Sequence, residues 1–287
     1  MSVATLTRTR GVLPALEQLY ECERLAEFDL PSELADAYGG PLGFSEPRLY
    51  ANFVATIDGV VALPGQSHSS RIISEYSTAD RFVMGLLRAC ADAVLVGAET
   101  MRDSPGSLWT AEQAYPPAAA LFAELRRRRE QPPRPTIAIL SGHGTVNPRH
   151  PALEDGALVL TSEAGAARMR GHVAGATTVV IGPAPHLDPV AAVKALRSRG
   201  NRLILSEGGP NTFGTLLAAG LVDELFLTTS PLFAGRTADS PRQALVAGIE
   251  LLPATTVGCE LLTIRRAGAQ LFSRYRVSNQ ERWGVAP

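Results

Sequence analysis

The stretch that decides the fold is ACADAVLVGAET, residues 89–100. Residues 93–97 are continuously apolar, as expected for a strand that is covered on both faces of a parallel sheet. The preceding residues repeat with a helical period, and Ser77 or Thr78 is placed to cap the first turn. The apolar face of this helix holds Phe82, Val83, Leu86, Leu87 and Cys90. The stretch therefore predicts a helix that leads directly into a buried strand.

The same alternation continues along the chain. Short apolar or alternating runs predict strands at residues 49–57, 136–140, 157–160, 178–181, 202–205 and 224–231. Helical patterns lie between the later ones, at 163–170, 189–199 and 212–219, as in successive β-α-β units. Runs at 256–264 and 270–277, separated by Gly268, predict a hairpin. The fold class is therefore α/β, with a mostly parallel central sheet flanked by helices and a C-terminal β-hairpin.

The two ends of the chain are expected to lie outside this domain. Residues 12–27 have apolar residues at roughly helical spacing, and a Gly/Pro-rich stretch follows at 38–47. We therefore divide the chain into a helical extension and linker (1–47), a single α/β domain (48–278) and a tail (279–287). Within the domain, residues 103–134 are interpreted as an insertion that holds one helix, with the arginines at 126–129 facing solvent.

Composition excludes several classes of function. The 287 residues carry 27 basic and 28 acidic side chains, and this balance gives no basic surface for nucleic acid or anionic membranes. The three cysteines are far apart and without metal-ligand spacing, which predicts neither a disulfide framework nor a metal site. No apolar run is long enough to span a membrane. We expect a cytoplasmic enzyme or binding protein.

Functional residues are sought where parallel strands end, because ligands bind outside the carboxyl ends of such strands. Gly97, Ala98, Glu99 and Thr100 follow one strand, and small residues at a helix start allow a phosphate to approach the backbone. A structural turn is the alternative reading. After the strand at 202–205 come Glu207, Gly208, Gly209, Pro210, Asn211 and Thr212. Two glycines before a helix start predict either a tight connection or a pyrophosphate cradle, and we favour the cradle.

Two hydroxyl residues complete this edge. Ser141 and Thr161 each follow an apolar strand and are candidates for an adenosine phosphate, although a turn or cap would place the same residues there. Arg102 and Arg149 are candidates for a 2′-phosphate, with an ordinary surface position as the alternative. No GxGxxG or GxSxG motif is present. A phosphate-cradling sheet without a covalent catalyst suits hydride transfer, in which the cofactor carries the chemistry.

The order of the motifs resembles a known family. ANFVATIDGVVA (51–62), LRACADAVLVGAETMR (87–102) and SEGGPNTFGTLLAAGLVDELFLTTSPLFAG (206–235) together resemble the reductase domain of bacterial riboflavin biosynthesis and its dihydrofolate-reductase-like relatives. The similarity spans about residues 48–277. It implies a dihydrofolate-reductase-like fold, NADPH as hydride donor, a pyrimidine substrate and usually a homodimer. No deaminase signature precedes the domain, so a reductase alone is expected.

The resemblance also implies roles for individual residues. Ala55, Thr56 and Asp58 fall on the strand-turn motif that lies beside the nicotinamide and the substrate. The motif at 96–100 and the glycines 208 and 209 would meet the cofactor phosphates, and Glu207 would point towards the reacting pocket. Ser141 and Thr161 match the strand ends that hold the adenosine phosphate.

Three departures from the family pattern concern the substrate side. Val60 stands where a basic residue is frequent, Glu99 replaces a glycine, and the acidic substrate-binding segment survives only as Asp103, Ser104 and Pro105. A related pyrimidine, a pterin or another conjugated C=N or C=O compound is therefore the expected substrate class.

From these positions we expect Glu207 and Asp58 to be the catalytic carboxylates, with Asp103 helping to hold the substrate. The alternatives are an ion pair or helix cap for Glu207 and a turn residue for Asp58. Two rival functions follow from the same sequence. One is a non-catalytic NADP(H)-binding protein with a degenerate substrate pocket. The other is a different α/β enzyme such as a Rossmann transferase, which the missing GxGxxG disfavours.

Overall fold

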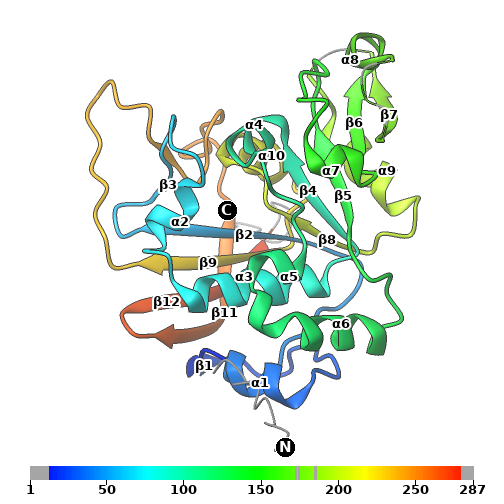
Figure 1. Cartoon of the computed structure of the whole chain (residues 1–287). Helices are drawn as coiled ribbons and strands as arrows, with labels where there is room; N and C mark the ends of the chain where they lie inside the picture. Colours follow the sequence, from blue (N-terminus) through cyan, green and yellow to red (C-terminus); the bar gives the residue numbers. More distant parts are fainter. Residues whose placement is uncertain (1–12, 172, 174, 184–185, 279–287) are drawn as a thin grey trace, which may run out of the picture.

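A ten-stranded sheet organises the computed structural model, which describes residues 13–171, 173, 175–183 and 186–278 (Figure 1). Its parallel part has the order β9-β2-β8-β4-β5-β6-β7, and it continues antiparallel from β9 through β12, β11 and β1. A separate two-stranded sheet pairs β3 with β10. The strands are β1 (Glu17–Glu21), β2 (Arg48–Thr56), β3 (Val60–Ala62), β4 (Ala93–Gly97), β5 (Thr136–Leu140), β6 (Leu158–Ser162), β7 (Thr177–Gly182), β8 (Leu203–Ser206), β9 (Glu224–Ser230), β10 (Gln243–Ala244), β11 (Gly258–Ala267) and β12 (Gln270–Ser278). The expected mostly parallel sheet and C-terminal hairpin are confirmed.

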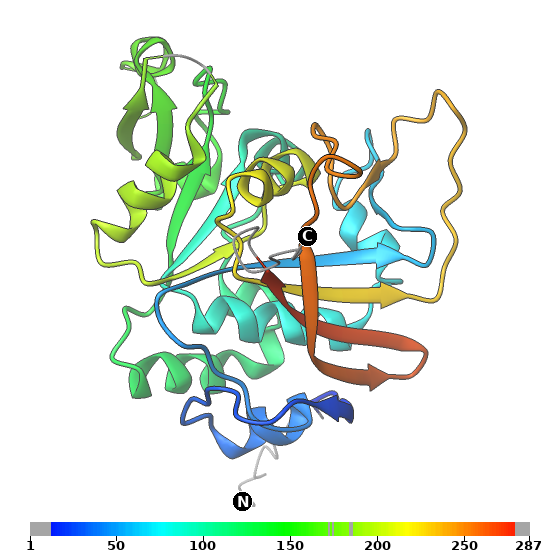
Figure 2. The same cartoon turned by 180° about the vertical axis from the view of Figure 1, so that it is seen from behind.

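Helices cover both faces of the parallel part (Figures 1 and 2). They are α1 (Ser32–Tyr38), α2 (Ser69–Ile73), α3 (Thr78–Cys90), α4 (Ala98–Asp103), α5 (Ala111–Ala114), α6 (Ala119–Arg128), α7 (Pro151–Glu154), α8 (Glu163–Met169), α9 (Pro189–Arg197) and α10 (Pro210–Ala218). None of the described helices is both long enough and apolar enough to cross a membrane.

Strand β4 shows why its sequence is continuously apolar. Val94 and Val96 belong to the core formed under α3 and α6, whereas Leu95 belongs to the core formed under α9 and α10. Each side chain therefore leaves water on one face or the other, as the sequence predicted. The preceding helix α3 begins as expected, because the Ser77 hydroxyl accepts a hydrogen bond from the Asp80 backbone N–H at 3.2 Å.

The predicted N-terminal helix over residues 12–27 is wrong for the described part of that range. Residues 17–21 form β1, which pairs antiparallel with β11, and Leu19 and Tyr20 are exposed. The free edge of the long strand β11 offers backbone hydrogen bonds to this segment, and these stabilise a strand more than the short apolar pattern stabilises a helix. An ion pair of 2.6 Å between the buried Arg265 and the partly exposed Glu21 joins the same two strands.

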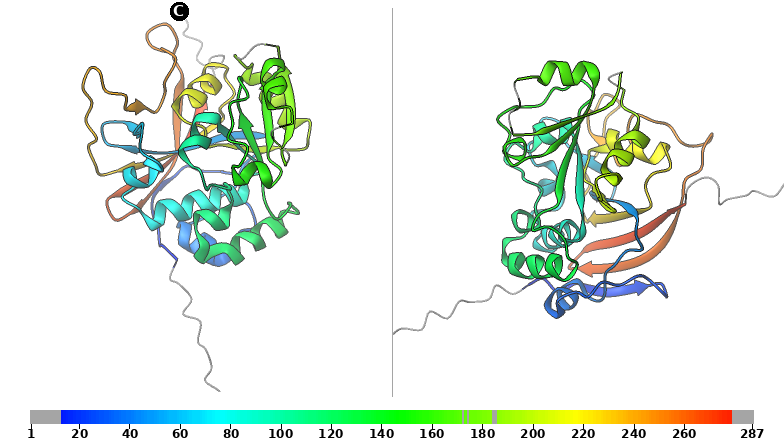
Figure 3. Two further views of the ribbon diagram at one scale, coloured as in Figure 1. Left: turned by 45° about the horizontal axis from the view of Figure 1, so that its top comes forward. Right: turned by 90° about the vertical axis from the view of Figure 1, so that its right-hand side faces the viewer.

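Residues 38–47 are also more than a linker. Leu42 and Phe44 are buried in the core under α3, and the Phe44 ring stacks on Tyr50 of β2 at 4.4 Å between centroids. The N-terminal segment therefore packs against β2 and the core under α3, and through β1 against the antiparallel strand β11, far from β6 and β7 (Figure 3). Residues 1–12 and the predicted tail 279–287 lie outside the described residues.

The expectation for residues 103–134 needs two corrections. The segment contains α5, a 3₁₀ turn (Pro116–Ala118) and α6 in place of one helix. Arg126 does not face solvent: it is buried and donates to the carbonyl groups of Ala89, Ala91 and Pro132. These carbonyls include the end of α3, where a helix leaves acceptors without partners. A cation there is favourable for the helix dipole as well.

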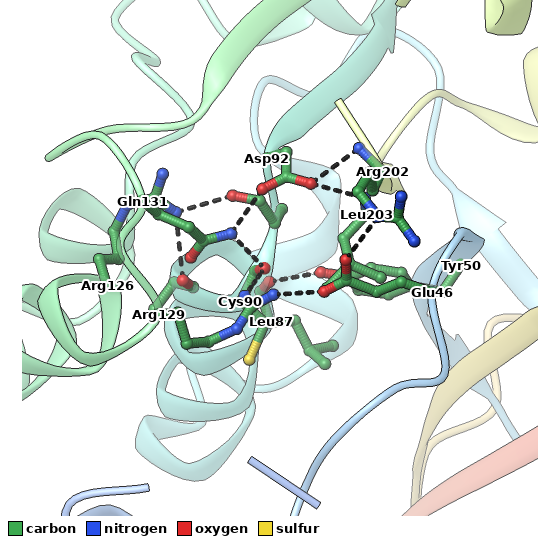
Figure 4. A network of polar contacts seen from close by, with 12 residues as sticks. Glu46, Tyr50, Leu87, Cys90, Asp92, Arg126, Arg129, Gln131, Arg202 and Leu203 are labelled. Carbon is green, nitrogen blue, oxygen red and sulfur yellow. Dashed lines mark hydrogen bonds and ion pairs between the residues drawn. The ribbon is translucent and has the colours of Figure 1, made fainter. Parts of the chain in front are cut away.

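A polar network surrounds this arginine at the amino ends of the strands (Figure 4). Asp92, directly before β4, accepts hydrogen bonds from the backbone N–H groups of Arg202 and Leu203 at 2.8 and 2.7 Å and from Gln131 at 2.6 Å. Glu46, just before β2, pairs with Arg129 and Arg202. The network ties three strand starts together, and the opposite edge of the sheet is left for ligands.

Candidate functional site

A cavity of about 340 Å³ lies at the carboxyl ends of β4 and β8. Its walls come from β2, β3, α2, α3, α4 and the residues that follow β8. Seven residues predicted to bind ligand line it: Glu99, Thr100, Asp103, Glu207, Gly208, Gly209 and Pro210. The remaining predicted residues lie outside its lining.

The structure brings the two glycine-containing junctions together because β4 and β8 are neighbours in the sheet. The backbone N–H of Gly209 donates to the Thr100 hydroxyl at 2.9 Å, and that of Glu207 donates to the Leu95 carbonyl, also at 2.9 Å. Asn211 and Thr212 form the first turn of α10, and Ala98 begins α4. Two helix starts therefore point their free N–H groups towards one edge.

The three glycines of these junctions serve different purposes. A Cβ on Gly97 would lie 2.7 Å from the Thr212 hydroxyl, and one on Gly208 would lie 2.6 Å from the Thr212 methyl group. These two glycines are therefore required for packing against α10. A Cβ on Gly209 would meet only the Thr100 hydroxyl, at 3.5 Å. Gly209 is thus the glycine whose missing side chain leaves open space beside the cavity.

Glu207 is held by a buried arginine. The guanidinium of Arg88 donates to both carboxylate oxygens, at 2.8 and 2.6 Å, and the two side chains are 7% and 9% exposed. Both residues line the cavity. The sequence prediction placed Glu207 at the pocket without its partner. A bidentate pair of this kind fixes the orientation of the carboxylate.

Asp80 is a functional candidate that the sequence reasoning missed. Its carboxyl group lines the cavity, is 5% exposed, and has the hydroxyl groups of Thr228 and Ser74 within hydrogen-bonding range. Burial raises the pKa of Asp80 from 3.8 to about 6, and the nearby charge of Glu207 contributes in the same direction. The sequence does place this carboxylate on the same helical face as the apolar residues Val83 and Leu87. An acidic residue in the first turn of a helix is also expected from the helix dipole alone, so its position did not indicate a functional role.

Asp58 lies beside the cavity but not in its lining. Its carboxylate accepts hydrogen bonds from the Thr56 hydroxyl at 2.6 Å and from the backbone N–H groups of Ala234 and Gly235 at 3.0 and 2.7 Å. These bonds, the Thr56 hydroxyl first, lower the pKa of Asp58 to about 2. Asp58 therefore anchors the loop after β9 to the turn after β2. Ala55 and Thr56 are buried at the end of β2.

Ser141 and Thr161 lie at the ends of the next two strands, β5 and β6. The Thr161 hydroxyl donates to the Ser141 carbonyl at 2.6 Å. The Ser141 hydroxyl is buried and has no hydrogen-bond partner within the described part of the chain. Arg102, in α4, and Arg149, in the loop between β5 and α7, are both exposed. A buried hydroxyl without a partner lowers the stability of the fold, and a ligand atom that hydrogen-bonds to it would restore that free energy.

The cavity also has a cationic rim. Arg71 lines it from α2, is exposed, and forms no ion pair with any described residue. Burial, and then the charge of Arg71, lower the pKa values of His68 and Arg81, which line the same cavity. A rim of this kind attracts an anionic group of a ligand.

Comparison with known families now identifies the chain. Residues 47–263 match the family described as the RibD C-terminal domain. The chain belongs to this family. Membership makes it an oxidoreductase of the kind that works with a nicotinamide cofactor, which confirms the class of enzyme and the resemblance inferred from the motifs.

Individual relatives agree with this assignment. The chain is 25% identical over 201 residues to the 2,5-diamino-6-ribosylamino-4(3H)-pyrimidinone 5′-phosphate reductase of Archaeoglobus fulgidus, which covers 68% of this chain and 84% of the relative. A pyrimidine reductase-like protein of Corynebacterium diphtheriae has a similar structure, with a TM-score of 0.62, 24% identity and coverage of 81% and 92%.

The third relative is a longer protein. It is the Thermotoga maritima deaminase/5-amino-6-(5-phosphoribosylamino)uracil reductase, with a TM-score of 0.56 and 18% identity. The match covers 81% of this chain and 57% of that protein. These solved structures share the α/β fold of this chain, which confirms the expected fold class.

Proposed function

We propose that the chain is an NADPH-dependent reductase that transfers hydride to a C=N or C=O group of a pyrimidine or pterin-like small molecule. The observation that carries this proposal is the hydrogen bond from Gly209 to Thr100. It joins two helix starts at one edge of a cavity whose inner wall holds Asp80 and Glu207. The name of the archaeal relative, a reductase of a ribosylamino-pyrimidine phosphate, supports the pyrimidine class.

The residues at the strand ends fit a nicotinamide dinucleotide. A Cβ would fill the open space at Gly209, so the backbone there has room to approach a pyrophosphate. The unpartnered hydroxyl of Ser141 would bind an adenosine phosphate, with Thr161 beside it. Residues 97–100 and 208–212 would hold the pyrophosphate, and Arg102 or Arg149 would pair with the 2′-phosphate that distinguishes NADPH from NADH. The bound cofactor supplies the hydride.

Reduction of a C=N or C=O group also requires a proton on nitrogen or oxygen, and the chain must supply or relay it. The pKa of Asp80, about 6, lets this carboxyl group hold a proton or release it near neutral pH. Glu207, held in place by Arg88, would orient amino or amide groups of the substrate by accepting hydrogen bonds. Asp58 stays a predicted catalytic residue, and its contacts are those of a loop anchor that positions the end of β2.

The cationic rim suits the phosphate of a phosphorylated substrate. Arg71 is exposed and unpaired within the described residues, so a phosphate can reach it without breaking an existing ion pair. Asp103 and Glu99 line the cavity from α4 and would repel such a group. This charge asymmetry would fix the orientation of the substrate in the cavity.

We further propose that the protein is a homodimer located in the cytoplasm. The antiparallel strands β9, β12 and β11 carry apolar side chains in adjacent register on one face of the sheet. Leu225 is buried in the core that includes residues of α10, whereas Leu227, Leu261, Ile264 and Tyr275 are only partly buried. An apolar sheet face of this kind is stabilised when it packs against a second copy. Light scattering after gel filtration would test the dimer, and a monomer at micromolar concentration would refute it.

The function is tested by titrating the purified chain with NADPH and NADH and then measuring turnover of ribosylamino-pyrimidine phosphates and of dihydrofolate. We expect tighter binding of NADPH and turnover of at least one substrate. Tight binding without any turnover would favour the rival NADP(H)-binding protein. Failure to bind either cofactor would refute the proposal.

A further inference from the structure

The reductases related to this chain differ in one chemical feature of their substrates. The name of the archaeal relative specifies a pyrimidinone with an amino group at position 2, whereas the name of the Thermotoga protein specifies a uracil, which has an oxygen there. The first presents two neighbouring N–H donors, the amino group and the ring N3–H. The second presents a carbonyl oxygen beside the N3–H. Which edge this chain recognises depends on the polar group at the inner wall of its cavity.

Four carboxyl groups line the cavity, and only one of them is both buried and without a cation. Each oxygen of Glu207 already accepts a hydrogen bond from a cation, Arg88. Glu99 and Asp103 are exposed on α4. Asp80 is 5% exposed and forms no ion pair with any described residue. It is therefore the buried carboxyl group of the cavity that has no charged partner among the described residues.

The surroundings of Asp80 leave room for further hydrogen bonds. A carboxylate can accept about four hydrogen bonds, and the hydroxyl groups of Thr228 and Ser74 lie within hydrogen-bonding range of Asp80. Two arginines of the cavity lining donate elsewhere: Arg81 to the carbonyl groups of Ala114 and Gln113, and Arg88 to Glu207. At least two acceptor positions of Asp80 therefore have no donor among the described residues.

The remaining wall suits a flat ring. Phe53, Val54, Val61 and Met84 line the same cavity from β2, β3 and α3. Apolar side chains of this kind bury the faces of a planar heterocycle, while its polar edge must find partners at a few fixed groups. Asp80 is the buried group placed to meet that edge.

We propose that Asp80 makes the cavity selective for a planar heterocycle with a 2-amino-4-oxo edge, and against the corresponding uracil. This inference rests on the proposed reductase function and names its substrate class. The two N–H groups of the 2-amino edge match the two carboxylate oxygens, in the same parallel arrangement by which a guanidinium pairs with a carboxylate. A uracil would place its position-2 oxygen against a carboxylate oxygen and lose one hydrogen bond. Both 2-aminopyrimidinones and dihydropterins carry the preferred edge.

The test compares three substrates with NADPH: the 2,5-diamino-pyrimidinone phosphate, the matching uracil phosphate and dihydrofolate. We expect kcat/KM for at least one 2-amino compound to exceed that for the uracil by roughly 100-fold or more, because a site built to bind a donor rejects an analogue that lacks it. Turnover of the uracil at an equal or higher kcat/KM would overturn the inference and leave the reductase function standing. Turnover of none of the three would instead refute the proposed function.

The variant Asp80→Asn separates recognition from a merely structural role. Its amide replaces one acceptor oxygen by a donor, so it mismatches the 2-amino edge and complements the N3–H and oxygen of uracil. We expect kcat/KM for the 2-amino compound to fall about 100-fold while that for the uracil falls less than tenfold or rises. An equal fall for both would contradict the assignment.

Two controls keep this result interpretable. Asp36→Asn makes the same chemical change on the exposed surface of α1 and should leave both substrates unaffected. Binding of 2-aminopyrimidin-4-one and of uracil to the unaltered chain, measured by calorimetry, gives the preference even if the Asp80 variant does not fold. Tighter binding of uracil in that experiment would overturn the inference.

Discussion

The ion pair between Arg88 and Glu207 can be tested as a structural element and as a part of the site. Both side chains are less than a tenth exposed, and two hydrogen bonds of 2.8 and 2.6 Å join them. Arg88→Met leaves the carboxylate of Glu207 buried without its cation. Loss of one partner from a buried pair costs about 3–5 kcal/mol. For a chain of this size we expect the thermal midpoint to fall by roughly 6–12 °C.

The double variant Arg88→Met with Glu207→Met separates the fold from the chemistry. It removes both charges, and packed apolar side chains in place of a buried pair are often neutral for stability. We therefore expect most of the lost stability to return, which corresponds to a coupling free energy of about 2–3 kcal/mol in a double-mutant cycle. Circular dichroism melts of the four proteins measure it. Turnover should stay low in the double variant, because the carboxylate that faces the cavity is gone.

The result that would refute this reasoning is a small effect. If Arg88→Met lowered the free energy of unfolding by less than about 1 kcal/mol, the pair would behave like an exposed one. Full turnover by the stable double variant would separately remove Glu207 from the reaction and leave it as a structural residue. Glu207→Gln would then also keep its kcat, whereas we expect kcat to fall with NADPH affinity unchanged.

Three further predictions follow from single contacts. Gly209→Ala should fold normally, because the φ of −64° at this position is ordinary and the atom nearest to the new Cβ would lie 3.5 Å away. It should weaken NADPH binding about tenfold in a fluorescence titration. Gly208→Ala should instead lower the free energy of unfolding by about 1–3 kcal/mol, because the new Cβ clashes with Thr212. The pKa of Asp80 is raised in the folded state, so the free energy of unfolding should fall by on the order of 3 kcal/mol as pH rises through the interval from 3.8 to about 6. Urea unfolding at pH 4 and 7.5 measures this loss, which Asp80→Asn should remove. An unchanged pH profile in the variant would contradict the raised pKa. Arg126→Met should lower the free energy of unfolding by about 3 kcal/mol, because buried carbonyl groups lose their donor. The same change at the exposed Arg127 should lower it by less than about 0.5 kcal/mol. Equal thermal midpoints for the two variants would refute the role of Arg126.

The parallel core of the fold could be predicted because its signals are local. The apolar run of β4 and the helical period of α3 each follow from neighbours in the chain, and both elements occur where expected. The N-terminal segment could not be predicted in this way. Residues 17–21 become a strand only because β11, more than 200 positions later in the chain, offers a free edge.

The site shows the same division. The strand-end glycines could be found because adjacent residues in the sequence determine a turn between a strand and a helix. In the fold, β4 and β8 are neighbours, and this brings Thr100 and Gly209 into contact. Arg88 and Asp80 were missed because their meaning depends on burial. Both read as ordinary polar positions of an amphipathic helix until the fold encloses them.

The pairing of each polar group indicates what it is for. Asp58 and Glu207 have their oxygens satisfied by backbone N–H groups or by an arginine, so their described contacts hold the shape of the site. Asp80 lacks a cation and the Ser141 hydroxyl lacks a hydrogen-bond partner among the described residues, although both are buried. A buried carboxyl group without a counter-charge and a buried hydroxyl without a partner both cost free energy that the fold alone does not return. A bound ligand would return it, and we propose that the two groups lie at opposite ends of one reductase site, at the substrate wall and at the strand end proposed for the adenosine phosphate.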